Sequence, residues 1–313
     1  MRSAQMNGYG NSEVIQINQN ANAPSDPSAG KVLVKVKAAG INPFDWKIRE
    51  GYMRQMIPLK FPTTPGGDFS GVVEKVGDQI SGMQQGDEVY GQASVLGGGS
   101  GAFAERALAN ADTIAYKPKS LNSKEAAGLP VVGVSAWQAL VDDIGLQSGQ
   151  KVLIHGGAGG IGSIAIQLAK SLGAHVATTV RANDMQYVKE LGADEIIDYQ
   201  TQNFDQSLHD YDAVYDTVGG ETYATSFKVL KKGGIIVSML EQPNQELMKQ
   251  FGVRAVIRMV QVNKERLTKL AQWVDQNNIR VNVDRTFLLE EAGKALDYQR
   301  DEHPRGKVVL EIQ

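Results

Sequence analysis

The sequence predicts an α/β protein in which a doubly wound parallel sheet is combined with a second, β-rich domain. Short apolar strands alternate with amphipathic helices between residues 150 and 240, a pattern typical of parallel sheets covered by helices. The first third of the chain instead has short strands of period two, bounded by glycines. A closing strand at residues 307–312 has the same alternation. We therefore expect a discontinuous β-rich domain at 1–118 and 268–313, interrupted by a doubly wound α/β domain at 119–267.

Composition excludes several classes of function. The 313 residues include 32 Lys and Arg against 35 Asp and Glu, a net charge of -3, which does not suit a nucleic-acid or anionic-membrane partner. Cysteine is absent and only four histidines occur, none spaced i, i+4, so neither a disulfide framework nor a metal site is expected. No apolar run of about 18 residues and no N-terminal apolar segment is present. We expect a cytoplasmic protein without a membrane span.

The β-rich part begins with a clear alternation. Within residues 31–38, Val32, Val34 and Val36 share one face and lysines the other, as in a half-buried strand. Further strands are expected at residues 71–76 and 87–90. The proline-containing segment 42–67 between them is a long loop, and such loops in compact domains are often functional.

A helical stretch is expected at residues 123–141, broken at Pro130 and Gly133. The alternation of strands and helices starts after it. A strand at residues 152–155 precedes a helix whose apolar residues recur at i, i+3, i+4 and i+7 from Ile161. The remaining elements follow from the same periodicities. Strands are expected at 175–180, 195–197, 212–215 and 234–239, and helices at 184–191, 221–230, 264–276 and 289–298.

Residues 157–162 form a G-x-G-x-x-G motif placed between the first of these strands and its helix. That context is the one a dinucleotide-binding loop requires. Gly157 would permit the tight turn, Gly159 the approach of a pyrophosphate, and Gly162 the packing of helix on strand. The helix N-terminus adds free N–H groups and a positive dipole end.

The end of the next strand predicts which dinucleotide binds. A carboxylate for the ribose diol is expected there in NAD-binding chains, but Arg181 occupies the place. Its forked guanidinium suits a 2′-phosphate, which favours NADPH over NADH. Two alternatives remain open: Arg181 is only a surface residue, or Asp184 lies near the ribose.

In these motifs the chain resembles the medium-chain dehydrogenase/reductase superfamily. The branch it resembles is that of the zinc-free quinone oxidoreductases, which includes zeta-crystallin. The resemblance covers nearly the whole chain and implies a GroES-like catalytic domain beside a Rossmann NADPH-binding domain. Its markers are AGINPFD (39–45), PGGDFSGVV (65–73), GDEVYG (86–91), SAWQAL (135–140), the glycine loop, LGAD (191–194), DTVGG (216–220) and RGKVV (305–309).

The sequence departs from the zinc-dependent alcohol dehydrogenases of this superfamily. These have a cysteine near Asn42 and a His-Glu pair near Gly67 and Asp68, where this chain has neither, and the four cysteines of their structural zinc lobe are also missing. Activation of an alcohol by a Lewis acid is therefore not expected. The reaction still compatible with the sequence is direct hydride transfer from NADPH to an acceptor that is already electrophilic.

The resemblance points to Asn42, Asp45 and Tyr52 as catalytic residues. Asn42 would donate a hydrogen bond to the acceptor oxygen, Asp45 would orient a water or a cationic group, and Tyr52 would donate a proton. Each has a structural alternative. Asn42 before Pro43 can shape a turn, Asp45 can cap a helical turn, and Tyr52 can pack in a wall.

The same resemblance implies the cofactor contacts. Ser135 is expected near the nicotinamide, Val218 and Gly219 at the ribose, Tyr199 near the adenosine phosphate or its ring, and Lys307 on the phosphate side, alternatively as a strand-edge charge. The full expected set is Ser135, Gly157, Ala158, Gly159, Gly160, Ile161, Gly162, Thr179, Arg181, Tyr199, Val218, Gly219, Met239, Leu240 and Lys307. The substrate is expected between the two domains.

The leading functional hypothesis is a zinc-independent NADPH:quinone oxidoreductase. The first alternative is an enone, enal or enoyl-thioester reductase, which uses the same hydride step on an α,β-unsaturated carbonyl. The second is a non-catalytic NADPH-binding structural or regulatory protein, since fold does not fix function. By analogy with the family, a homodimer joined through residues 254–260 is expected.

Overall fold

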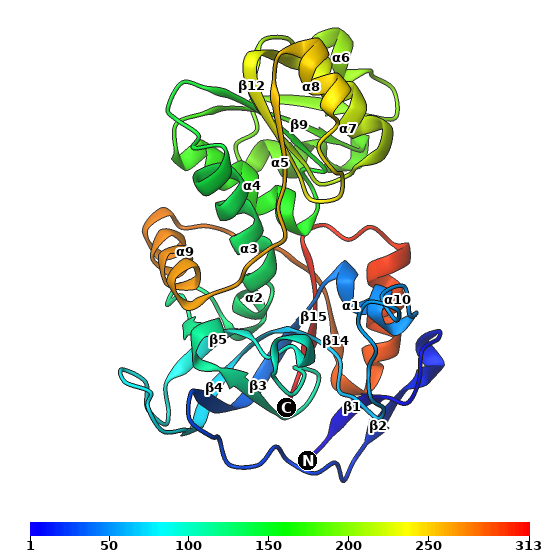
Figure 1. Cartoon of the computed structure of the whole chain (residues 1–313). Coiled ribbons are helices and arrows are strands. Elements are labelled where there is room, and N and C mark those ends of the chain that lie inside the picture. Colours follow the sequence, from blue (N-terminus) through cyan, green and yellow to red (C-terminus); the bar gives the residue numbers. More distant parts are fainter. The chain divides into compact units, whose positions relative to one another are not determined.

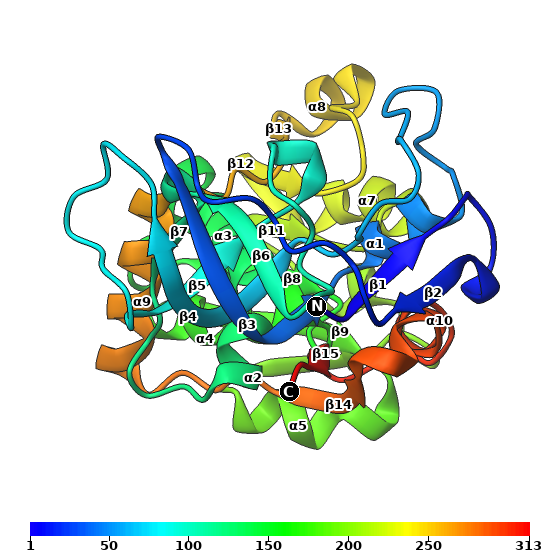
Figure 2. The ribbon, with the colours of Figure 1, turned by 90° about the horizontal axis from the view of Figure 1, so that it is seen from below.

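The computed structural model describes residues 1–313, and the chain divides into two compact units. The first unit contains residues 1–131 and 262–313, and the second contains residues 132–261. The second unit is therefore one continuous insertion in a discontinuous first unit. Figures 1 and 2 show the elements of both units.

The boundaries of the insertion lie inside those expected from sequence, because residues 119–131 and 262–267 belong to the first unit. Polar contacts explain this assignment. Ser70 Oγ donates to the carbonyl oxygen of Ser123 (2.6 Å), and Tyr90 Oη donates to that of Leu267 (2.7 Å). Both segments are thus tied to the sheet of the first unit.

The first unit is built on a mainly antiparallel sheet of order β14-β15-β3-β4-β5-β7, with β6 also paired to β3. The strands are β3 (Lys31–Ile41), β4 (Asp68–Val76), β5 (Glu88–Gln92), β6 (Arg106–Asn110), β7 (Ile114–Tyr116), β14 (Val283–Leu288) and β15 (Lys307–Glu311), with a separate pair β1 (Ser3–Met6) and β2 (Ile15–Asn18). Val308 of β15 lies opposite Ile41 of β3. The closing strand thus returns to the N-terminal β-region, as expected.

The predicted alternation of β3 is confirmed. Val32, Val34 and Val36 are buried, whereas Lys35 and Lys37 are exposed. The valines join Phe69 of β4 and other apolar side chains in the core of this unit. The second half of β3 is buried on both faces, because α2 (Ser123–Ala127) packs against it.

The short helix α1 (Pro43–Arg49) was not predicted. Its N-terminus uses local capping, with Pro43 in the first turn and the Asp45 carboxylate accepting from the Asn42 N–H at 2.8 Å. The other helices of this unit are α9 (Lys264–Asn277) and α10 (Ala292–Asp301). α1 packs beside α10, and α10 also contacts β2 (Figure 2).

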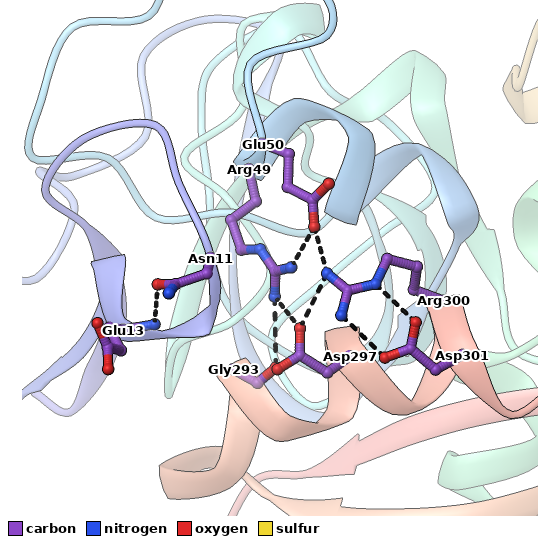
Figure 3. A network of polar contacts seen from close by, with 8 residues as sticks. All are labelled: Asn11, Glu13, Arg49, Glu50, Gly293, Asp297, Arg300 and Asp301. Atoms are coloured by element: carbon purple, nitrogen blue, oxygen red, sulfur yellow. Dashed lines mark hydrogen bonds and ion pairs between the residues drawn. The ribbon is translucent and has the colours of Figure 1, made fainter.

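An ion-pair network joins α1 to α10 (Figure 3). Arg49 is completely buried, and its two Nη groups donate to Asp297 Oδ1 (2.8 Å) and Glu50 Oε1 (2.7 Å). Arg300 of α10 pairs with the same Glu50 and with Asp301. The network holds the helix that carries Asp45 against the C-terminal part of the chain.

The second unit contains a six-stranded, entirely parallel sheet of order β10-β9-β8-β11-β12-β13. The strands are β8 (Lys151–His155), β9 (His175–Val180), β10 (Glu195–Asp198), β11 (Tyr211–Asp216), β12 (Leu230–Ser238) and β13 (Arg254–Ile257); the helices are α4 (Gly160–Ser171), α5 (Met185–Glu190), α6 (Phe204–Ser207), α7 (Gly220–Ser226) and α8 (Gln245–Phe251). The strand order reverses between β8 and β11. The doubly wound Rossmann arrangement is confirmed, and ligands of such sheets bind at the carboxyl ends beside the reversal.

The helical stretch predicted at residues 123–141 is broken once rather than twice. α2 ends before Gly128, and α3 (Pro130–Trp137) starts with Pro130 in its first turn. Gly133 lies inside α3, so the prediction that it breaks the helix is wrong; buried neighbours on both sides stabilise the helix there. A π-helical segment, Gln138–Asp143, follows. No helix of the chain is both long enough and apolar enough to span a membrane.

Candidate functional site

The glycine loop connects β8 to α4 at the carboxyl edge of the parallel sheet. The turn needs a positive φ at Gly156 (68°), one residue before the position expected. Gly157 is required for packing instead, because a Cβ there would lie 2.1 Å from Thr178 Oγ1. A Cβ on Gly162 would lie 2.3 Å from the carbonyl oxygen of Gly156, which agrees with its expected role in helix–strand packing.

The loop is open where a pyrophosphate would approach. A Cβ on Gly159 would meet only the carbonyl oxygen of Gly156, at 3.4 Å. Residues 158–161 are partly exposed, whereas Gly157 and Gly162 are buried. Gly159 is the N-cap of the twelve-residue α4, whose first N–H groups have no helical partner. This arrangement of Ala158, Gly159, Gly160 and Ile161 suits a bound diphosphate.

A chain of hydrogen bonds that runs from Ser226 through His155 to Thr179 supports the glycine loop. Ser226 Oγ donates to the carbonyl oxygen of Thr222 (2.6 Å), so it accepts from Nε2–H of His155 (2.9 Å). Nδ1 of His155 then accepts from Thr179 Oγ1 (3.0 Å), which itself accepts from Gly156 N–H (3.3 Å). Thr179 is buried, and its hydroxyl group holds the loop; its role as a cofactor contact stays a prediction.

The buried imidazole is neutral. Burial lowers the pKa of His155 to about 4, and the negative charge of Asp216 opposes that shift only in part. The neutral ring is the form that the hydrogen-bond chain requires, since one nitrogen donates and the other accepts.

Arg181 and Tyr199 lie together after the adjacent strands β9 and β10. Arg181 Nε donates to Tyr199 Oη at 3.0 Å, and the Tyr199 side chain is half exposed. This contact leaves both Nη groups of Arg181 free of hydrogen bonds. The pair presents a guanidinium fork and an aromatic face at the edge that carries the glycine loop, the two features that suit an adenosine 2′-phosphate.

The ends of β11 and β12 complete this edge. Asp216 is buried; its Oδ1 accepts from the N–H groups of Val218 (3.0 Å) and Gly219 (2.9 Å), and its Oδ2 accepts from Ser238 Oγ (2.7 Å). Gly219 has a φ of 79°, which favours glycine. Val218 and Leu240 remain half exposed, so apolar side chains line the edge here.

Met239 continues from β12, with its N–H donating to the carbonyl oxygen of Asp216 (3.0 Å). The structure thus brings the glycine loop, Arg181, Tyr199, Val218, Gly219, Met239 and Leu240 to one edge of one sheet. Ser135 comes from a different element, α3, where it is buried.

A second group of polar residues is buried in the first unit. Asn42, Asp45, Asp68 and Lys307, which we call the buried polar cluster, are each at most 8% exposed. Asn42 Nδ2 donates to Asp68 Oδ2 (2.9 Å), and Lys307 Nζ donates to Asn42 Oδ1 (2.5 Å) and to the carbonyl oxygen of Ile41 (2.6 Å). The sequence-predicted residues Asn42 and Asp45 therefore lie together, at the N-terminus of α1.

Burial dominates the electrostatics of the cluster. It raises the pKa of Asp45 to about 7, an effect that the Asn42 N–H and the Lys307 charge oppose and that the Asp68 charge reinforces. Burial also raises the pKa of Asp68, against the charge of Lys307 and three hydrogen bonds. It lowers the pKa of Lys307, against both carboxylates.

Two expected residues have other surroundings. Tyr52 is 70% exposed, and its ring packs edge-on against Trp46 with centroids 5.9 Å apart, so it makes no polar contact with the cluster. Lys307 is 3% exposed with its ammonium on Ile41 and Asn42. That placement differs from the expected approach to a cofactor phosphate, because the charged end is enclosed in the first unit.

The sequence reasoning missed Asp68 and Gln92 as members of the site. Asp68 Oδ1 accepts from Gln92 Nε2 (2.9 Å), and its Oδ2 accepts from the Val131 N–H (3.1 Å) at the start of α3. The available signal was a carboxylate inside the otherwise apolar and glycine-rich stretch 65–73. Such a residue is buried only when it is paired.

The cluster does not suit a zinc ion. The chain has no group of three or more His, Cys, Asp or Glu side chains arranged so that they could hold a metal ion. The Lys307 ammonium, which has donors only, lies within the cluster on Asn42 Oδ1 and the carbonyl oxygen of Ile41. The donor set is thus one amide, two carboxylates and a lysine.

Two family models match the chain. The one described as alcohol dehydrogenase GroES-like domain matches residues 28–119, and the one described as zinc-binding dehydrogenase matches residues 191–310. The second description is a family label and by itself assigns no metal ion to this chain.

Relatives and solved structures match over the whole chain. A 2-methylene-furan-3-one reductase of Solanum lycopersicum is 36% identical, over 99% of this chain and 79% of its own length. The structure of the Coxiella burnetii quinone oxidoreductase has a TM-score of 0.91 at 34% identity, covering 100% of this chain and 99% of that one. The Escherichia coli quinone oxidoreductase complexed with NADPH has a TM-score of 0.88 at 26% identity, covering 99% and 100%.

Proposed function

Because the chain belongs to the medium-chain dehydrogenase/reductase superfamily, in its zinc-free quinone oxidoreductase branch, we propose that it is an NADPH-dependent oxidoreductase that passes a hydride to a quinone. One observation carries the proposal: the open glycine loop and the free guanidinium fork of Arg181 lie at the same edge of a doubly wound sheet. That combination matches a dinucleotide with a 2′-phosphate.

The choice of NADPH rests on Arg181. No carboxylate ends β9, the position at which one would accept hydrogen bonds from a ribose diol and repel a phosphate. The structure of the Escherichia coli relative is described as complexed with NADPH, which supports the same preference. Ser135, the loop residues, Val218, Gly219, Met239 and Leu240 belong to the proposed cofactor site.

Replacing Arg181 with alanine should weaken NADPH binding by about tenfold to a hundredfold, because charge-assisted hydrogen bonds to a phosphate are lost. NADH has no 2′-phosphate, so its affinity should change little. Fluorescence titration of both cofactors measures the two effects, with Tyr199→Phe as a milder variant that removes only the acceptor of Arg181 Nε. Equal losses for NADPH and NADH would contradict the assignment.

On the acceptor side, the proposal gives Asn42 the main role. Bound NADPH would supply a hydride, and the acceptor oxygen would gain negative charge as the hydride arrives. The Asn42 amide would donate a hydrogen bond to that oxygen and stabilise the charge. A proton completes the hydroquinone; Asp45 would orient the water that brings it, and Tyr52 is the second proposed proton donor.

A second candidate function is reduction of an enone double bond. The specific observation in its favour is the similarity to the tomato 2-methylene-furan-3-one reductase, which is 36% identical to this chain. A hydride from bound NADPH would add to the β-carbon, the same Asn42 donor would stabilise the enolate oxygen, and a proton from water would complete the α-carbon. Only the acceptor differs between the two candidates.

The test is NADPH consumption with two quinones, an enone, an enal and, in the reverse direction, an alcohol with NADP. We expect turnover with the quinones and a preference for NADPH over NADH. Turnover with the enone or enal alone would replace the first candidate by the second. NADPH binding without any turnover would favour a non-catalytic nucleotide-binding protein.

Assembly and location remain predictions. β13 lies at the end of the sheet order of the second unit, which leaves its outer edge unpaired within the chain and supports residues 254–260 as the interface of a homodimer. Sedimentation of the purified protein measures the state. A cytoplasmic location stays a prediction as well.

A further inference from the structure

Two charged groups fix the orientation of the Asn42 side-chain amide. Lys307 Nζ donates to Asn42 Oδ1 at 2.5 Å, and Asn42 Nδ2 donates to Asp68 Oδ2 at 2.9 Å. An ammonium has only donors and a carboxylate only acceptors. A reversed amide would place its oxygen against the carboxylate and its NH₂ group against the ammonium, so only one orientation satisfies both partners.

In this fixed orientation, one hydrogen of the Asn42 side-chain NH₂ group is not used by Asp68. The NH₂ group of an asparagine has two hydrogens, and Asp68 accepts one of them. The second has no partner within the protein. It is therefore the hydrogen that remains for an acceptor oxygen.

Both charged groups are themselves held by strands. Lys307 begins β15, where it lies opposite Val283 of β14 and next to the Val308–Ile41 pair with β3. Asp68 begins β4, and Gln92 of β5 donates to its second oxygen. The amide is thus oriented by groups on two strands of the sheet, although Asn42 itself lies between β3 and α1 as the N-cap of the helix.

We propose that Lys307 is a positioning residue for hydride transfer: its ammonium holds Asn42 Oδ1, so that one Nδ2 hydrogen stays directed at the acceptor oxygen. This inference rests on the proposed function, in which Asn42 is that donor. It gives Lys307 a role distinct from contact with a cofactor phosphate. It also differs from a purely structural role, in which Lys307 would only balance the buried charge of Asp68.

Three variants separate these roles. Lys307→Met removes the ammonium at similar length but leaves Asp68 buried without its counter-charge. The double variant Lys307→Met/Asp68→Asn removes both charges and keeps an oxygen at position 68 that can accept from Asn42. Asn42→Ala removes the group on which Lys307 is proposed to act.

The measurement is the single-turnover rate of NADPH oxidation at saturating quinone, with NADPH bound in advance, accompanied by NADPH titration and urea unfolding. We expect Lys307→Met to lower the rate by about tenfold to a hundredfold, as for a misplaced oxyanion donor, with NADPH affinity unchanged. The double variant should regain stability and stay slow. In the Asn42→Ala background, Lys307→Met should have little further effect on the rate.

Each other outcome overturns the inference in a recognisable way. Full recovery of the rate in the double variant would show that Lys307 only balances the charge of Asp68. A loss of NADPH affinity in Lys307→Met would favour a contact between Lys307 and the cofactor. If Lys307→Met slows the Asn42→Ala variant as much as the wild type, Lys307 does not act through Asn42, while the role of Asn42 stands. An unchanged rate in Asn42→Ala itself would remove Asn42 from the proposed function, and the inference with it.

Discussion

Replacing Arg49 with alanine should lower the free energy of unfolding by about 3 kcal/mol, because it breaks a buried ion-pair network. Arg49 is completely buried and donates to Asp297 and Glu50. Its loss leaves both carboxylates short of a partner and a void between α1 and α10 (Figure 3). The two carboxylates are partly exposed (29% and 20%), so water can rehydrate them, which places the effect at the lower end for buried pairs.

Arg300→Ala is the matched control for this prediction. Arg300 pairs with the same Glu50 and with Asp301, but about a third of its side chain is exposed. Exposed ion pairs contribute about 1 kcal/mol or less. Urea unfolding of the two variants gives the comparison. Similar losses for Arg49→Ala and Arg300→Ala would mean that burial of Arg49 adds nothing to its contribution.

The parallel sheet was the most predictable part of the fold. Its central strands β8, β9 and β11 are buried along nearly their whole length, and such strands are typically short and mostly apolar. The strand at residues 175–180 was predicted with the bounds that β9 has. β3 was also predictable from its alternation, but only as far as Ala38. Beyond Ala38 both faces of the strand are buried, so the period of two is lost.

Elements that depend on packing were not predictable. α1 has seven residues, too few to give an apolar face of recognisable period, and its packing rests on the buried Arg49. Gly133 has a low helix propensity, yet it lies in a helix because the surrounding α3 is buried. In each case a tertiary contact outweighs the local preference.

The candidate site shows the same division. The glycine loop and Arg181 follow from local context, since strand, loop and helix are adjacent in sequence. The buried polar cluster does not, because Lys307 and Asn42 are 265 positions apart. The contact of Arg181 with Tyr199 lies between: each residue was expected near the cofactor, but their pairing depends on β9 and β10 being neighbours in the sheet.

The largest expected effect on cofactor binding comes from Gly162. Gly162→Ala would place a Cβ 2.3 Å from the Gly156 carbonyl oxygen and 2.7 Å from the Gly157 Cα. Both are backbone atoms, so α4 must move away from β8. We expect a loss of about 1–3 kcal/mol of stability, typical of overpacking, together with loss of measurable NADPH binding, because the loop and the helix N-terminus move apart.

Gly159→Ala should separate binding from folding. Gly159 has a φ of -74°, which alanine adopts readily, and its Cβ would meet only one atom, at 3.4 Å. Stability should therefore change by less than about 1 kcal/mol, because alanine adopts this φ without strain. The methyl group would nevertheless occupy the path of the pyrophosphate, so NADPH affinity should fall by about tenfold or more. Urea unfolding and NADPH titration of both glycine variants test this. Wild-type affinity in Gly159→Ala would mean that the dinucleotide does not approach the loop at this residue, whereas lost affinity in a fully stable Gly159→Ala would place the pyrophosphate against it.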